Sequence, residues 1–133
     1  MNKKIWVSSP HKGGTEQRYV REAFDTNWVA PLGPNVNGFE LDLETYLNQN
    51  VFVGALSSGT AAIHLGLIIL GVKAGDEVIC QSMTFSASAN PIKYQGATPV
   101  FIDSEAETWN LCPKALEEAI IDRIAKGKKP KAI

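Results

Sequence analysis

A short turn of small and polar residues is the part of this chain best suited to chemistry, and it consists of Ser58, Gly59, Thr60 and Ala61. The preceding stretch, 51–56, is short, apolar and partly β-branched, so we expect a buried strand there. The stretch after the turn is rich in Ala, Leu and Ile and ends at Gly71, which predicts a helix over 60–70. A strand that turns into a helix leaves free backbone N–H groups at the positive end of the helix dipole, and such groups can bind a phosphate.

The spacing of this turn separates it from two familiar phosphate loops, since it matches neither G-x-x-x-x-G-K-S/T nor G-x-G-x-x-G. From the residues alone, two interpretations stay open. Either the turn anchors a phosphate, or Ser58 simply caps the helix while Gly59 eases the change of chain direction. A complete nucleotide-binding module of Rossmann type would need a glycine fingerprint and a downstream acidic residue, which this chain lacks.

Helical and strand-like patterns alternate along the chain, without an interdomain linker. We expect helices over 15–26, 36–49, 60–70 and 113–126, a helix between 86 and 95, and strands over 51–56, 77–81 and 98–102. Thr15 is the expected cap of the first helix, Pro113 suits the first position of the last helix, and Pro91 should make its helix start late or kink. Near the end, a basic turn leads into two apolar residues, Ala132 and Ile133, which read as the start of a further strand. This alternation predicts a parallel or mixed α/β sheet with helices on both faces.

Composition argues against several classes of function. The 133 residues carry a formal net charge of −1, which gives no basic footprint for nucleic acid. Cys80 and Cys112 show neither metal-ligand spacing nor a disulfide framework, so we expect free thiols and no metal site. The apolar run 5–7 is too short for a signal peptide, and no run approaches the roughly 20 apolar residues of a membrane span. We therefore expect a cytoplasmic protein without a membrane partner.

Several motifs stand in the order typical of one known family, and they are 28–34 (Trp-Val-Ala-Pro-Leu-Gly-Pro), 57–65 (Ser-Ser-Gly-Thr-Ala-Ala-Ile-His-Leu), 75–79 (Gly-Asp-Glu-Val-Ile), Thr84-Phe85, 96–103 (Gly-Ala-Thr-Pro-Val-Phe-Ile-Asp) and 108–111 (Thr-Trp-Asn-Leu). With them the chain resembles the DegT/DnrJ/EryC1/StrS family of pyridoxal-phosphate-dependent sugar aminotransferases of fold type I. The likeness covers nearly the whole chain. It implies that 1–133, including the leading helices 15–26 and 36–49, is the amino-terminal part of the cofactor-binding large domain, incomplete at its carboxyl end. That domain has a mixed, mostly parallel sheet with helices on both faces.

The resemblance also assigns roles to residues. It implies that the turn 58–61 binds the phosphate of pyridoxal 5′-phosphate, with Gly59 offering no Cβ to block close approach. Phe85 would lie against the cofactor ring, whereas the residues alone favour a core aromatic beneath a loop. The lysine that forms the Schiff base, and the acidic partner of the ring nitrogen, would belong to sequence beyond Ile133. We therefore expect no catalytic residue in this stretch, and no activity from it alone.

Trp28 and His64 are two further residues with an expectation attached. A tryptophan in a loop rich in proline and glycine is unusual if that loop only faces water. The resemblance places this loop near the active site and the dimer interface, so Trp28 should either pack in the core or against a partner subunit, or flank the sugar substrate. His64 should be partly buried and hydrogen-bonded rather than catalytic.

For the intact protein, the resemblance implies an aminotransferase that moves an amino group, with glutamate as the implied donor, through pyridoxal phosphate to a nucleotide-linked keto sugar in a ping-pong cycle. Its product would enter polysaccharide biosynthesis, and the enzyme would be a homodimer. Two alternatives stay open: a pyridoxal-phosphate-dependent sugar dehydratase of the same family, and a non-enzymatic nucleotide- or phosphate-binding α/β module. The sugar, its nucleotide and the ketone position also stay open.

Overall fold

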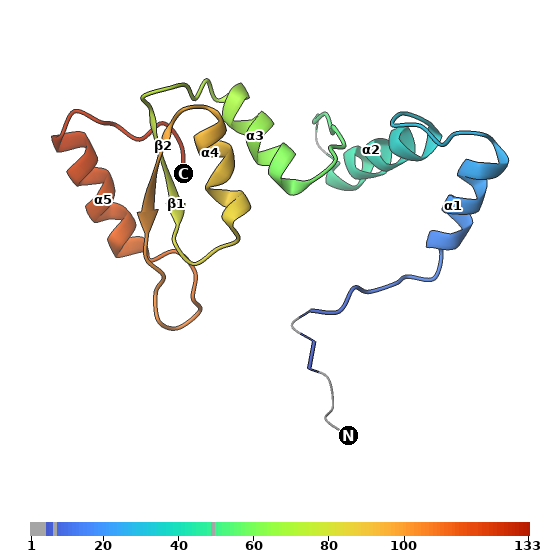
Figure 1. Cartoon of the computed structure of the whole chain (residues 1–133), viewed down its shortest axis with the longest axis horizontal. Coiled ribbons are helices and arrows are strands. Elements are labelled where there is room, and N and C mark those ends of the chain that lie inside the picture. The colour runs from blue at the N-terminus through green and yellow to red at the C-terminus, as the bar shows by residue number, and fades with distance from the viewer. Residues whose placement is uncertain (1–4, 7, 49) are drawn as a thin grey trace. The chain divides into compact units, whose positions relative to one another are not determined.

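The computed structural model describes residues 5, 6, 8–48 and 50–133 (Figure 1). Residues up to Ala55 form one compact unit, and residues from Leu56 onward form a second. In chain order the elements are α1 (Glu16–Asp25), α2 (Pro34–Leu47), α3 (Gly59–Ile69), β1 (Glu77–Gln81), the 3-10 helix η1 (Ser86–Ser88), α4 (Asn90–Tyr94), β2 (Thr98–Ile102) and α5 (Pro113–Ala125). The expected helices and strands are confirmed, apart from the strand over 51–56.

The strand predicted over 51–56 is absent, and that prediction was wrong. The backbone N–H of Val53 donates to Glu44 Oε1 over 2.9 Å, and that of Ala55 donates to Glu40 Oε1 over 2.7 Å. Both carboxylates belong to α2, so side chains take the donors that a neighbouring strand would otherwise take. β-branched residues indicate a segment that would pack well in a sheet, but a strand also needs a neighbouring strand to pair with.

In the first unit, the cap of α1 and the bounds of α2 differ from those that the sequence predicts. The predicted cap by Thr15 is not made, because its side chain accepts no capping hydrogen bond. The carboxylate of Glu16 instead accepts hydrogen bonds from the N–H groups of Gly13 and Gly14. α2 begins two residues earlier than expected, since Pro34 is tolerated in a first turn, and it ends before Asn48, whose φ is 45°. The predicted last residue, at position 49, lies outside the described residues.

The second unit is built around a parallel pair of strands, β1 and β2, paired from Glu77 with Thr98 to Gln81 with Ile102. The chain passes from β1 to β2 through η1 and α4. Pro91 lies in the first turn of α4, and the helix expected here is divided into two short pieces, as that proline predicts.

The segment 131–133 lies along the free edge of β1. The N–H of Lys131 donates to the Glu77 carbonyl over 2.7 Å, and the N–H of Ile79 donates to the Ala132 carbonyl over 3.0 Å. Ala132 thereby forms a parallel bridge with Val78. The expectation that this segment begins a strand agrees with this pairing.

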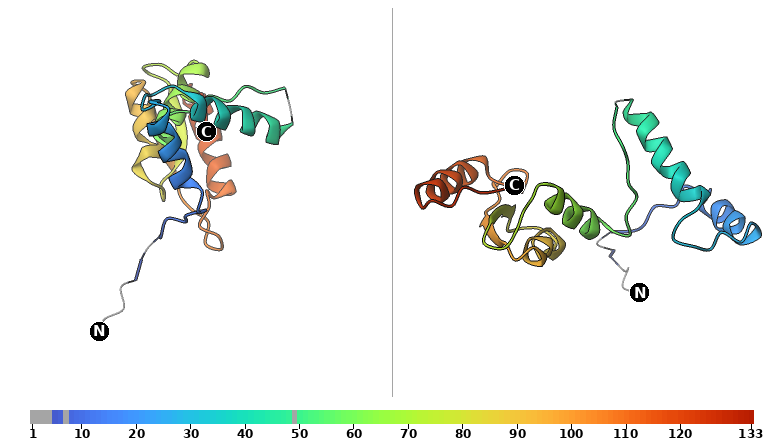
Figure 2. Two further views of the ribbon diagram at one scale, coloured as in Figure 1. Left: turned by 90° about the vertical axis from the view of Figure 1, so that its right-hand side faces the viewer. Right: turned by 90° about the horizontal axis from the view of Figure 1, so that it is seen from above.

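Helices cover both faces of these strands. β1 is joined to β2 through α4, whereas β2 is joined through α5 to segment 131–133 on the other side of β1. Because crossovers between parallel strands are right-handed, two crossovers that run in opposite directions place their helices on opposite faces. Figures 1 and 2 show α4 and α5 on opposite sides of the strands. The expected α/β arrangement is confirmed.

The outer edge of β2 is marked by a proline. Thr98 donates its N–H toward β1, to the Asp76 carbonyl over 2.9 Å. Neighbouring residues of a strand direct their N–H groups to opposite edges, so Pro99 occupies a position whose donor would point away from β1. A proline at such a position removes a donor from the open edge without breaking the ladder. β2 is therefore suited to be an edge strand.

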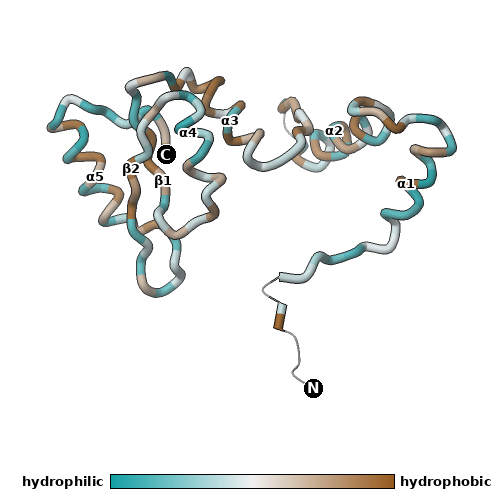
Figure 3. The backbone as a smooth tube through the Cα atoms, in the orientation of Figure 1, coloured by the Kyte–Doolittle hydropathy of each residue, from teal (hydrophilic) through white to brown (hydrophobic). Residues whose placement is uncertain are grey.

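The core of the second unit is small, and its buried apolar residues are Leu67, Val72, Val78, Ile79, Ile92, Ala97 and Ile102. Figure 3 shows apolar colouring along much of α3, and its last two residues, Ile68 and Ile69, are exposed, as is Leu70 directly after it. A helix that is apolar around most of its circumference is normally covered on several sides. Within the described part of the chain, no helix combines the length and apolar character needed to cross a membrane.

Candidate functional site

The site starts at the amino terminus of α3, where Ser58 caps the helix as the sequence predicts. Ser58 has an extended backbone, and its Oγ accepts a hydrogen bond from the Ala61 N–H over 3.1 Å. Its carbonyl accepts the N–H of Ala62, also over 3.1 Å, which is the first bond of the helix. The cap therefore satisfies the third amide of the helix and leaves the first two to other partners.

Those first two amides belong to Gly59 and Thr60, and neither has a hydrogen-bond partner among the described residues. They point outward from the positive end of the helix dipole, and the first turn of α3 carries no acidic residue. A Cβ built on Gly59 would meet no atom within 4 Å, so the fold itself leaves open space beside this turn. Two free donors, a positive dipole end and open space together fit a phosphate group.

Phe85 lies between the end of β1 and the start of η1, and the residue is 80% exposed. The interpretation of Phe85 as a core aromatic is therefore wrong for this structure. Its carbonyl accepts the N–H of Ser88 over 2.9 Å, and the hydroxyls of Thr84 and Ser88 are hydrogen-bonded over 3.0 Å. An exposed aromatic ring with a fixed backbone is free to contact a ligand.

The capped turn at the start of α3 and the segment around Phe85 both belong to the second unit, and they are linked through the contact between η1 and α3. α3 leads into β1 through the short connection 70–76, and the two elements run in opposite directions (Figure 1). The start of α3 therefore lies toward the carboxyl end of β1. η1, which follows Phe85 directly, contacts α3. Ser88 of η1 lines a hollow of about 280 Å³ together with Ile63 and Leu67 of α3.

Trp28 belongs to the first unit, whereas the turn and Phe85 belong to the second. The backbone N–H of Trp28 donates to the Ala23 carbonyl over 2.8 Å, and the residue is 51% exposed. A Cβ at Gly33, where φ is 156°, would lie 3.2 Å from Cε3 of the indole. The ring therefore packs on the Gly33 backbone on one side and meets solvent on the other, and its role in substrate or subunit contact stays a prediction.

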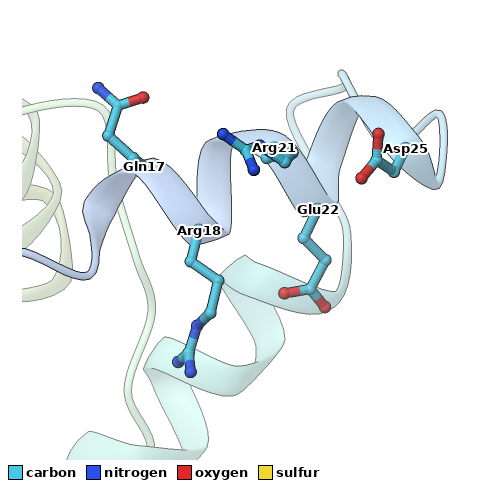
Figure 4. A pocket seen from close by; sticks show the side chains of 5 residues that line it. All are labelled: Gln17, Arg18, Arg21, Glu22 and Asp25. Carbon is cyan, nitrogen blue, oxygen red and sulfur yellow. The ribbon is translucent and has the colours of Figure 1, made fainter.

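A hollow in the first unit is lined by side chains of α1. Figure 4 shows it with its lining residues Gln17, Arg18, Arg21, Glu22 and Asp25. All of these side chains come from a single helix; two are basic, two are acidic and Gln17 is neutral, and they do not converge on a common point. Throughout the described residues, no group of three or more His, Cys, Asp or Glu side chains is arranged to hold a metal ion.

Two side-chain networks near the strands are not apparent from sequence spacing. Gln81, at the end of β1, donates through Nε2 to Ser104 Oγ over 2.9 Å and to the Trp109 carbonyl over 2.6 Å. His64 is half-buried, and its Nε2 lies 2.6 Å from Nε2 of Gln95, in agreement with the role expected for it. These contacts join residues far apart in the chain, so no local pattern signals them.

The two cysteines lie in or beside elements of the second unit, and both are half-buried. Cys80 lies in β1, where burial raises the pKa of its thiol and favours the protonated form at neutral pH. Cys112 precedes α5 without making a side-chain cap. Both are free, as the sequence predicts.

Comparison with known proteins identifies relatives along nearly the full chain. A model of the DegT/DnrJ/EryC1/StrS aminotransferase family matches residues 10–133. EpsN of Bacillus subtilis (strain 168), which its name places provisionally among the pyridoxal phosphate-dependent aminotransferases, is 55% identical over 133 residues, which are 100% of this chain and 34% of that protein. GDP-perosamine synthase of Escherichia coli O157:H7 is 40% identical over 123 residues, 91% of this chain and 33% of that protein. The chain thus spans about a third of the length of these relatives.

Solved structures show the same relationship. A protein of Streptococcus pneumoniae, Spr1654, provisionally named a sugar aminotransferase, matches in its PMP form with a TM-score of 0.77 and 36% identity, over 89% of this chain and 29% of that one. Its PLP form matches with a TM-score of 0.73 and 34% identity, over 89% of this chain and 30% of that one. GDP-4-keto-6-deoxy-D-mannose-3-dehydratase of E. coli, with bound hydrated PLP, matches with a TM-score of 0.74 over 86% of this chain and 30% of that one, but its 22% identity shows a shared fold alone. The second unit is thus part of a fold type I α/β domain, and the chain belongs to the DegT/DnrJ/EryC1/StrS aminotransferase family.

Proposed function

We propose that the intact protein transfers an amino group, from a donor such as glutamate, through pyridoxal phosphate to a keto sugar linked to a nucleotide. The names of relatives support this, because they include a GDP-perosamine synthase and a protein provisionally named a sugar aminotransferase, which was solved in PLP and PMP forms. We further propose a cytoplasmic homodimer whose product enters polysaccharide biosynthesis, and that 1–133 is the amino-terminal part of its large domain. The free thiols of Cys80 and Cys112 agree with a reducing compartment.

The observation that carries the proposal is the pair of unpartnered amides at the start of α3. Gly59 and Thr60 would donate their N–H groups to the cofactor phosphate, and the Thr60 hydroxyl would add a third donor. Ser58 would hold the turn in shape through its bond to Ala61. Phe85 would offer its exposed face to the ring. Pyridoxal phosphate, when bound, would supply the carbonyl that accepts the amino group from the donor, and its amine form would supply that group to the sugar ketone.

We also propose that the lysine that carries the cofactor is not one of the lysines of this chain. Each lysine that the structure describes is solvent-exposed, and these are Lys12, Lys73, Lys93, Lys114, Lys126, Lys128, Lys129 and Lys131. A Schiff-base lysine is held within a site that fixes its position and lowers its pKa. Borohydride reduction of the full-length protein with its cofactor, followed by peptide mapping, should label a peptide outside 1–133, and stoichiometric labelling of one of these lysines would overturn this proposal.

A two-step assay on the full-length protein tests the function. The protein loaded with pyridoxal phosphate is first mixed with glutamate, and conversion of the bound cofactor to its amine form is followed by absorbance. Nucleotide-linked 3-keto and 4-keto sugars are then added, and the amino sugar is detected by mass spectrometry. A product that has lost a hydroxyl group and gained no nitrogen would instead establish the dehydratase. Absence of cofactor binding would favour a non-enzymatic phosphate-binding module.

A further inference from the structure

The orientation of Phe85 is not fixed by packing. The residue is 80% exposed, so few neighbouring atoms restrict its ring. An aromatic ring contributes to ligand binding only when it is presented at the right angle, and a freely rotating segment would lose much of that contribution. The backbone around Phe85 must therefore supply the restraint.

Two hydrogen bonds enclose Phe85 from both sides. The Thr84 and Ser88 hydroxyls are bonded over 3.0 Å, and the Ser88 N–H donates to the Phe85 carbonyl over 2.9 Å. The hydroxyl pair, which we call the Thr84–Ser88 bridge, closes a loop around Phe85 and the first residues of η1. One end of the bridge is anchored, since Ser88 is half-buried and shares a hollow with Ile63 and Leu67 of α3.

We propose that Thr84 and Ser88 are positioning residues that hold Phe85 in the orientation needed to contact a ring-shaped ligand. This inference rests on the proposed function, because it takes the cofactor ring as that ligand. The bridge ties Thr84, next to Phe85, to Ser88 of η1, and η1 contacts α3, the helix whose first turn offers the phosphate donors. Through it, the ring surface and the phosphate turn are fixed to the same helix.

The test uses the full-length protein and measures two quantities, the dissociation constant for pyridoxal phosphate by equilibrium dialysis and the induced circular dichroism of the bound cofactor. Thr84→Val removes the hydroxyl and keeps the shape of the side chain. A hydrogen bond of this kind corresponds to an affinity change of roughly two- to tenfold. Thr84→Val and Ser88→Ala should each weaken binding by that factor and reduce the dichroic band. Thr84→Ser, which keeps the hydroxyl, should restore both.

A double-mutant cycle separates positioning from direct contact. Combined with Phe85→Ala, Thr84→Val should cause no further loss, because the residue that it positions is gone. An equal loss in both backgrounds would show that Thr84 contacts the cofactor itself and would overturn the positioning role. Thr45→Val is the matched control, since Thr45 makes a similar side-chain bond to Leu41 within α2 and should leave binding unchanged.

The outcomes also distinguish this inference from the proposed function. If Phe85→Ala weakens binding while Thr84→Val and Ser88→Ala, both folded, bind as the parent does, the bridge has no positioning role although the cofactor site stands. If folded Phe85→Ala binds as tightly as the parent, the assignment of Phe85 to the site fails, and the positioning role fails with it.

Discussion

Arg123 of α5 and Glu77 of β1 form a bidentate ion pair that joins α5, on one face of the sheet, to β1. Nε of Arg123 lies 2.8 Å from Oε2 of Glu77, and Nη2 lies 2.8 Å from Oε1. The Glu77 side chain is only 8% exposed, and its backbone carbonyl accepts the N–H of Lys131. One residue of β1 therefore links the helix that crosses over the sheet to the segment that pairs at its far edge.

Removing Arg123 should destabilise the second unit markedly, because the Glu77 carboxylate would remain nearly buried without a counter-charge. We expect Arg123→Met to lower the melting temperature of the full-length protein by roughly 5 °C, and Arg123→Lys, which loses the paired geometry, to have a smaller effect. Lys114→Met is the control, because Lys114 and Glu118 are exposed and 4.0 Å apart. Equal melting temperatures for the two methionine variants would show that the ion pair adds no stability.

Substitutions at Gly96 and Gly71 separate two costs of adding a side chain, namely crowding against a neighbour and an unfavourable backbone conformation. Both follow a helix, and both have a φ of 71°. A Cβ at Gly96 would lie 3.0 Å from Cβ of Ala74, whereas a Cβ at Gly71 would meet no atom within 4 Å. Gly71→Ala should cost about 1 kcal/mol for the left-handed backbone alone, and Gly96→Ala should cost about 1–3 kcal/mol more for crowding. Chemical denaturation of the full-length variants measures the difference, and equal costs would contradict the contact.

Acidification should release the loop that follows β2. Hydrogen bonds from the Thr108 side chain, and from the N–H groups of Glu107 and Thr108, lower the pKa of Glu105 below its ordinary value of 4.5. A depressed pKa means that the stabilisation is complete above pH 4.5 and is lost as the pH falls through the lower, folded-state value. Carbon-detected NMR titration should give a Glu105 midpoint below 4.5 in the parent. Thr108→Val should raise that midpoint, and an unchanged midpoint would remove the Thr108 hydroxyl as its main cause.

Local chemistry accounts for what the sequence predicts well. Ser58 precedes an apolar helical stretch, and its side chain bonds to the amide only three residues later, so a short stretch of sequence is enough to predict the cap. Pro91 divides its helix because the missing N–H and the ring act on the same turn. The alternation of strands and helices predicts the parallel pairing, because two parallel strands need a crossover connection, which is usually a helix.

Contacts between distant residues account for what the sequence does not reveal. The segment 51–56 has a strand-like composition, but two carboxylates of α2 take its donors, and no periodicity reports a side chain that reaches back to a backbone. The pairing of Glu77 with Arg123 spans 46 positions. Phe85 is exposed and η1 contacts α3, and neither fact can be read from the residues beside Phe85 in the sequence.

The isolated stretch 1–133 should fold poorly. Large apolar side chains are exposed in both units, among them Phe39, Phe52, Ile69 and Ile121, and the buried core is small. Exposed apolar surface of this kind favours association. We expect the purified stretch to bind a hydrophobic dye and to melt without a sharp transition. A monomer that melts cooperatively at low concentration would contradict this expectation and would support a complete phosphate-binding module.

Gly59 gives the most direct test of the phosphate turn. Because a Cβ at this position meets no protein atom within 4 Å, Gly59→Val should leave the fold intact, and any loss of cofactor binding must arise from the ligand side. We expect affinity for pyridoxal phosphate to fall by at least roughly tenfold, the effect of losing one or two hydrogen bonds to a charged group. Gly38→Val is matched to it, since Gly38 is also helical, in α2, with no atom within 4 Å of its Cβ position. Circular dichroism checks that both variants fold. If the two folded variants bind the cofactor equally well, the free amides of Gly59 and Thr60 do not hold its phosphate, and the turn is only a helix cap.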